Sequence, residues 1–135
     1  MGAPRLVFDE QGRGMAYYAS GRVAACCTAK TSYSSCFYFY RDDKKNTPLC
    51  TIDDKFCGFA DAKDGSRFVL SKKGGIWSDG DGTIRREWTW GEGSKPPLVN
   101  LKLSNELTLE FAERETCAVR LRFANCSRDF DVSLK

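Results

Sequence analysis

The 135-residue sequence contains no histidine. Histidine is the commonest general base, the usual partner of serine and cysteine nucleophiles, and the commonest metal ligand. Its absence removes the usual catalytic pairs and the most frequent kind of metal site. The sequence therefore favours a protein that is not an enzyme and that holds neither a cofactor nor a metal.

Membrane and export segments are also missing. No run approaches the roughly 18 apolar residues that a transmembrane helix needs. The N-terminal stretch MGAPRLVFDEQG is not followed by the apolar run of a secretory signal. Leu6 stands where a myristoylation site needs serine or threonine. We therefore expect an intracellular, cytoplasmic protein that does not bind membranes.

The chain has seven cysteines, and no two of them have the CxxC spacing. Structural zinc sites use closely spaced thiolate pairs, because four ligands must close a tetrahedron without straining the chain. The odd number and the lack of a signal sequence favour reduced cysteines that act as small hydrophobic residues.

The charge is too balanced to indicate a nucleic-acid-binding protein. The net charge is +3, from 21 basic and 18 acidic residues. The two signs are interleaved, as in RDDKK at 41–45, which is typical of a solvated loop. The aromatic run FYFY at 37–40 could stack bases, but Asp42 and Asp43 beside it oppose phosphate binding. We expect no nucleic-acid partner.

The sequence does contain short alternating runs separated by glycines. Alternation of apolar and polar residues predicts antiparallel strands with one buried face. Even NELTLEFAERE, rich in helix formers, keeps a period of two through Leu107, Leu109 and Phe111. We predict strands within 34–43, 83–90, 97–104, 106–111, 117–123 and 130–134. The predicted fold is all-β, with short antiparallel strands and hairpins in a sandwich or open-roll arrangement and little or no helix.

The length fits a single β domain over residues 1–135. Pro96 and Pro97 interrupt the strand pattern, because proline has no N–H to donate to a sheet. We expect them to join two sub-layers, 1–94 and 98–135. Segments 9–27 and 54–75 also resemble each other, each with two short strands around a glycine turn, which is a weak internal repeat.

The segment SDGDGT at 78–83 resembles the start of a calcium loop. Counted from Asp79, an EF-hand loop needs glycine at position six and glutamate at position twelve. Here those positions are Ile84 and Trp90. Repeated Asp-Gly between two alternating runs instead predicts a hairpin turn.

The strand after this turn has Ile84, Arg86, Trp88 and Trp90 on one face. The tryptophans would either anchor a sheet-on-sheet core or receive a partner protein. A fully buried Arg86 would need a carboxylate partner. We therefore expect that the strand leaves the core near Arg86 or that a second protein shares this face.

Aromatic residues and arginine dominate protein-binding hot spots. The candidate protein-binding residues are Tyr17, Tyr18, Tyr38, Tyr40, Trp77, Arg86, Trp88 and Trp90. An alternative is a small-ligand or carbohydrate-binding module that uses the surface tryptophans. An enzyme built on carboxylate pairs, such as Asp42–Asp43, Asp53–Asp54 or Asp79 with Asp81, ranks last.

Several motifs occur in the order of a known family. They are YYASGRVA at 17–24, KGG at 73–75, WTW at 88–90, Pro96–Pro97 and LKLSN at 101–105. In this order they resemble the carboxy-terminal domain of glutamate-rich protein six and its relatives. The resemblance implies a structural role in the axoneme of motile cilia and sperm flagella. Partners would be other axonemal proteins, such as radial-spoke or microtubule-associated ones, and no catalytic residues would be expected.

Overall fold

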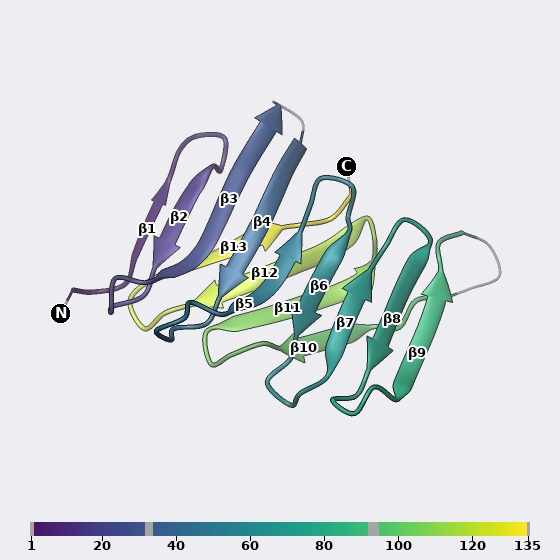
Figure 1. Cartoon of the computed structure of the whole chain (residues 1–135). Coiled ribbons are helices and arrows are strands. Elements are labelled where there is room, and N and C mark those ends of the chain that lie inside the picture. The colour runs from purple at the N-terminus through teal and green to yellow at the C-terminus, as the bar shows by residue number, and fades with distance from the viewer. Residues whose placement is uncertain (1, 32–33, 92–94, 135) are drawn as a thin grey trace.

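A computed structural model describes residues 2–31, 34–91 and 95–134. Over these ranges the chain forms thirteen strands in two antiparallel sheets and no helix (Figure 1). The predicted all-β fold is therefore confirmed. No element in the described ranges is a helix that could span a membrane.

The first sheet is a meander in which every strand pairs with its neighbours in sequence. Its nine strands are β1 (Arg5–Phe8), β2 (Gly14–Tyr17), β3 (Val23–Thr31), β4 (Ser34–Tyr40), β5 (Pro48–Ile52), β6 (Gly58–Asp61), β7 (Arg67–Leu70), β8 (Gly74–Ser78) and β9 (Ile84–Thr89). Most are only four to six residues long, since a turn follows at once.

The second sheet is a four-stranded meander formed by the rest of the chain. Its strands are β10 (Val99–Lys102), β11 (Leu107–Glu113), β12 (Thr116–Arg122) and β13 (Ser127–Asp131). The last strand begins three residues earlier than the predicted 130–134.

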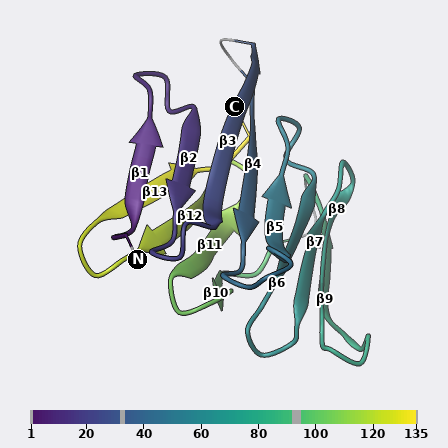
Figure 2. The same ribbon diagram turned by 60° about the vertical axis from the view of Figure 1, so that its left-hand side comes forward.

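The two sheets pack face to face, and their strands cross at a steep angle (Figures 1 and 2). The four-stranded sheet covers one face of the nine-stranded sheet. In both views no other described segment covers the opposite face. Strand β9 ends at Thr89 and β10 begins at Val99, so Pro96 and Pro97 lie in the connection between the sheets, where Pro97 is buried.

Five hairpin turns share one hydrogen-bond pattern. In each, the N–H of the first residue donates to the carbonyl of the fifth, and the N–H of the fourth donates to the carbonyl of the first. These turns are 9–13, 18–22, 53–57, 62–66 and 79–83. The fourth residue has a positive φ in every case, which glycine adopts without steric cost. The predicted hairpin at 79–83 is thus one member of a repeated turn.

Phe56 takes the glycine position in one of these turns, with φ of 60°. A left-handed conformation costs a residue with a side chain roughly 1–2 kcal/mol. The ring is only 1% exposed and packs against Trp90 and Phe111, with centroids 6.0 and 6.3 Å away. Burying a phenylalanine contributes about 1.5–3 kcal/mol, which offsets that cost.

Two aromatic clusters join the sheets. Phe111 of β11 meets Phe68 and Trp88 of the nine-stranded sheet and Trp90 just after β9, with ring centroids 5.1 to 6.3 Å apart. Phe130 of β13 likewise meets a second group from that sheet, Phe8, Phe37 and Phe39, at 5.3 to 6.4 Å. These contacts place the core between the layers and fix the relative position of the sheets.

Candidate functional site

The uncovered face of the nine-stranded sheet carries a row of residues that pair directly across the strands. Each member is the cross-strand partner of the next, so the row crosses the whole sheet. We call it the outer-face row: Val7, Met15, Cys26, Tyr38, Thr51, Phe59, Val69, Ile76 and Glu87. At about 4.8 Å between strands, the row is roughly 38 Å long.

All members of the outer-face row except Thr51 and Glu87 are apolar or aromatic. Val7 is 55% exposed, and Met15, Val69 and Ile76 are 37 to 38% exposed. The adjacent residues along each strand point to the other face; Ala16, Phe39 and Phe68, for example, have no exposed surface. Soluble monomers rarely expose long continuous apolar surfaces, so this row is the strongest interaction feature of the described chain.

Two arginines lie over aromatic rings on the same face. The guanidinium of Arg5 is 4.7 Å from the ring centroid of Tyr17, and that of Arg67 is 5.0 Å from the centroid of Phe59. Asp61 holds Arg67 by two hydrogen bonds of 2.6 and 2.8 Å, which raise the pKa of the guanidinium. Flat aromatic and guanidinium surfaces of this kind are typical of protein interfaces.

Three of the four candidate tyrosines lie on this outer face. Tyr38 belongs to the outer-face row, Tyr40 follows it on the same side of β4, and the Tyr17 hydroxyl contacts the sulfur of Met15 at 3.2 Å. Tyr18 points into the core instead and is 4% exposed. Its hydroxyl donates to the carbonyl of Tyr40 at 2.6 Å, and burial raises its pKa.

The three tryptophans lie on the inner side of the nine-stranded sheet or at its margin. Trp88 is 3% exposed, and its indole covers Gly75 of the neighbouring strand. Trp90 is half-buried, and its N–H donates to the carbonyl of Ser71 at 2.8 Å. Trp77 is half-buried beneath the guanidinium of Arg85. The tryptophan face is therefore mainly a sheet-on-sheet core.

The expected single face for Ile84, Arg86, Trp88 and Trp90 is wrong at Ile84. Trp77 of β8 pairs with Arg86 and Ser78 pairs with Ile84, so Arg85 is an extra residue that forms a β-bulge in β9. One extra residue reverses the alternation of side chains, so Ile84 is 54% exposed and contributes nothing to the core.

Arg86 lies beyond the covered part of the inner face. It is exposed, and its guanidinium donates to the carbonyl of Lys95 at 3.2 Å. The strand therefore leaves the core near Arg86, which was one of the two expected outcomes.

The acidic loop at 79–83 uses its carboxylates to build the turn. Asp79 pairs with Arg85, and Asp81 accepts the Thr83 N–H at 2.9 Å. The latter bond is the main reason that the pKa of Asp81 is lowered. Throughout the described ranges, no group of three or more cysteine, aspartate or glutamate side chains is placed to hold a metal ion.

Other paired acids have similar structural roles. Asp42 accepts from the Ser20 hydroxyl at 2.7 Å, and Asp43 accepts from the Thr47 hydroxyl and N–H at 2.6 and 2.9 Å. Asp53 accepts the N–H groups of Lys55 and Cys57, each at 2.9 Å. These carboxylates organise turns at the ends of the sheet.

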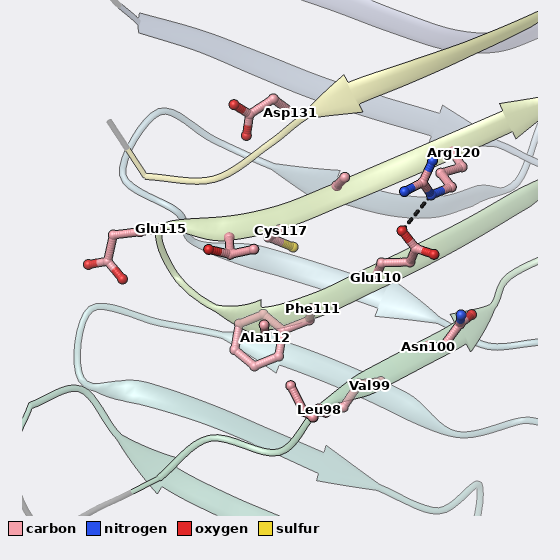
Figure 3. A pocket seen from close by; sticks show the side chains of 12 residues that line it. Leu98, Val99, Asn100, Glu110, Phe111, Ala112, Glu115, Cys117, Arg120 and Asp131 are labelled. Atoms are coloured by element: carbon pink, nitrogen blue, oxygen red, sulfur yellow. Dashed lines mark hydrogen bonds and ion pairs between the residues drawn. The ribbon is translucent and has the colours of Figure 1, made fainter.

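A shallow groove of about 570 Å³ lies on the outer face of the four-stranded sheet, beside Leu98, Phe111 and Cys117 (Figure 3). Its charged side chains already have partners. Arg120 pairs with Glu110 and, at 2.9 Å, with Asp129. This outer face is thus held by ion pairs, whereas that of the nine-stranded sheet presents apolar side chains.

A protein-family model described as FAM194 protein matches residues 3–135, nearly the whole chain. The chain belongs to the FAM194 family. The resemblance to the carboxy-terminal domain of glutamate-rich protein six is corrected by this match, which names a different family. The motifs behind that resemblance are short, from two residues at Pro96–Pro97 to eight at 17–24.

No curated protein and no solved structure matches this FAM194 chain. The match brings no information on axonemal partners or ligands, so the site must be interpreted from its own geometry.

Proposed function

We propose that this FAM194 chain is a non-catalytic interaction module that binds a partner protein through the outer face of its nine-stranded sheet. One observation supports the proposal most strongly: the outer-face row is continuous, largely apolar and partly exposed. A second protein that covered it would remove apolar surface from water at about 25 cal/mol per Å².

The composition of this face fits a protein partner better than a small molecule. The face is uncovered and crosses all nine strands, whereas small-molecule sites enclose most of their ligand. Tyr17, Tyr38 and Tyr40 would provide amphipathic contacts, and Arg5 and Arg67 would provide stacked guanidinium groups. Tyr18 and Trp88 are buried, so their proposed role is to stabilise the fold.

The proposal of a non-catalytic role is supported by chemistry. The sequence has no histidine. The carboxylates of Asp43, Asp53 and Asp81, which a glycosidase-like mechanism would need, are engaged in turns. The alternative of a ligand site on surface tryptophans has less support, because Trp88 is buried and the Trp90 N–H is already bonded.

The cellular setting is a separate proposal. We propose the axoneme of cilia or sperm flagella, with radial-spoke or microtubule-associated partners, and its support is the long outer-face row, which suits a module built into a larger protein assembly. Localisation of a tagged chain in ciliated cells tests it. We expect enrichment along the axoneme; a signal spread through the cytoplasm or nucleus would contradict the setting and leave the interaction surface itself untouched.

The interaction surface is tested with a double variant, Val69→Lys with Ile76→Lys. Each residue is 38% exposed, so the substitutions themselves should change stability little, and the two lysines would face each other across the strands; we expect a total destabilisation of roughly 1–2 kcal/mol. Proteins that co-purify with the wild-type chain in comparable amounts should be lost from the variant. Quantitative mass spectrometry of both samples is the measurement.

The matched control is Thr116→Lys with Ala118→Lys on β12, which adds the same two charges beside the groove of Figure 3. The control should retain the partners. Loss of the same partners from the control alone would move the interaction surface to the four-stranded sheet and contradict the proposal.

A further inference from the structure

Strand β10 is an edge strand with one free side. It pairs with β11 only, through Val99 to Lys102. In an antiparallel pair, the backbone groups of alternate residues face the partner strand and those between face away. An edge of this kind can pair with a further strand from another chain.

The hydrogen bonds show which residues of β10 face the free side. The Leu103 N–H donates to the Leu107 carbonyl at 2.9 Å, so odd-numbered residues face β11. The Lys102 carbonyl instead accepts the N–H of Lys63, from the β6–β7 turn, at 2.8 Å. Asn100, two residues before Lys102, therefore directs both its N–H and its carbonyl to the free edge.

A crevice of about 550 Å³ borders this free edge. One wall is β10, with Asn100, Leu101 and Lys102, and the opposite wall is Trp77 of β8 and Arg85 of β9. In Figure 1 the β6–β7 turn lies next to β10, in agreement with the hydrogen bond between Lys63 and Lys102. We call this space the Trp77 crevice.

Trp77 contributes its aromatic ring to the crevice wall, with the guanidinium of Arg85 4.8 Å from the ring centroid. The indole N–H is buried and has no hydrogen-bond partner within the described part of the chain, so it lies behind this wall and we assign it no role in binding.

The charges around the crevice favour an acidic ligand. Asp64 and Asp79 are the acids nearby, and Arg85 pairs with both. Lys63 donates to the amide oxygen of Asn105 at 2.6 Å, and no carboxylate pairs with Lys63 or Lys102 in the described ranges. Lys63, Lys102 and Arg85 therefore face two carboxylates, Asp64 and Asp79, which leaves a net charge of +1 at the edge of β10.

We propose that the free edge of β10 binds an extended segment of a partner protein as an added strand, with an acidic side chain of that segment in the Trp77 crevice. Asn100 exchanges backbone hydrogen bonds with the segment, and Lys63 and Lys102 neutralise the carboxylate. This site lies away from the outer-face row, so it goes beyond the proposed function and does not depend on it.

Synthetic peptides test the proposal on the 135-residue chain. The probe is a fluorescein-labelled octapeptide of alternating valine and glutamate, and the matched peptide alternates valine and lysine. We expect the glutamate peptide to bind at least about tenfold more tightly in fluorescence anisotropy, which is the effect of one well-placed charge. In NMR spectra it should shift the amide resonances of Asn100 and Lys102.

Two variants separate strand addition from simple charge attraction. Asn100→Pro removes the outward N–H while leaving the ladder to β11, and prolines are tolerated on edge strands; Asn100→Thr keeps the N–H. We expect the proline variant to lose at least about tenfold in affinity and the threonine variant to stay within about twofold. Lys63→Glu with Lys102→Glu should abolish the preference for the glutamate peptide without changing the edge.

Equal affinity for the two peptides would overturn the acidic specificity. Undiminished binding to the Asn100→Pro variant, or amide shifts confined to other strands, would overturn strand addition at β10. Absence of any Asn100 shift at millimolar peptide would overturn the proposal as a whole. Partner loss in the Val69→Lys, Ile76→Lys variant does not bear on this site, so the two proposals fail independently.

Discussion

The contact between Gly75 and Trp88 gives a quantitative test of the core. A Cβ added at Gly75 would lie 2.6 Å from Cε2 and 2.9 Å from Cη2 of Trp88, and it would overlap Cζ2 as well. Real Cβ atoms essentially never come so close, so the indole must move. Trp88 is 3% exposed and packs on Phe68 and Phe111, which leaves it little room.

We expect Gly75→Ala to lower the free energy of unfolding by about 1–3 kcal/mol, the usual cost of overpacking a core. For a chain of this size that corresponds to a fall in Tm of roughly 3–6 °C per kcal/mol. Trp88→Phe should cost on the order of 1–2 kcal/mol, since it removes buried atoms. It also removes an indole N–H that is buried without a partner in the described chain.

The double variant distinguishes this collision from a backbone effect. Phenylalanine lacks the outer atoms of the indole that the new Cβ would meet, so the two substitutions together should cost less than their sum. We expect a coupling energy of about 1–2 kcal/mol, measured by urea unfolding followed by circular dichroism. Additive costs would refute the packing of Trp88 on Gly75 and with it the core position of the tryptophan face.

The remaining predictions concern cysteines and pH. Burial raises the pKa of the Cys50 thiol and raises that of Cys117 to about 12. Both thiols should therefore resist alkylation by iodoacetamide at pH 8 in the folded chain, whereas half-buried Cys126 should react. Equal alkylation rates for the three cysteines would contradict their placement. Hydrogen bonds lower the folded-state pKa of four turn carboxylates, which therefore stabilise the fold above their unfolded pKa, near 4, and lose that contribution as the pH falls through their folded values. The four carboxylates are those of Asp9, Asp43, Asp64 and Asp81. Tm should accordingly be flat from pH 7 to 5 and fall below about pH 4. A constant Tm down to pH 3 would show that these turn carboxylates contribute nothing to stability.

Local alternation was sufficient to predict most of the second sheet and the hairpin at 79–83. Strand β10 lies within its predicted range, and β11 and β12 match theirs to within one or two residues at each end, because each has an apolar residue at every second position facing the core. The four-residue strands β1, β2, β6 and β7 are too short for a period of two to be distinguished from chance.

The outer-face row could not be predicted, because it is a property of register between strands. Met15 and Cys26 become neighbours only once β2 and β3 pair, and Val69 and Ile76 only once β7 and β8 pair. The bulge at Arg85 was equally invisible, since a single extra residue leaves the sequence pattern of β9 apparently regular.

Site-specific photo-crosslinking can show whether a partner protein binds the outer-face row. A photoreactive phenylalanine analogue at Val69 lies within the outer-face row, and the same group at Ala118 lies on the outer face of the four-stranded sheet, between Glu110 and Asp131. In cells, we expect the Val69 probe to crosslink to one or a few discrete proteins and the Ala118 probe to give no crosslink. Crosslinks from Ala118 with none from Val69 would contradict the proposed interaction surface.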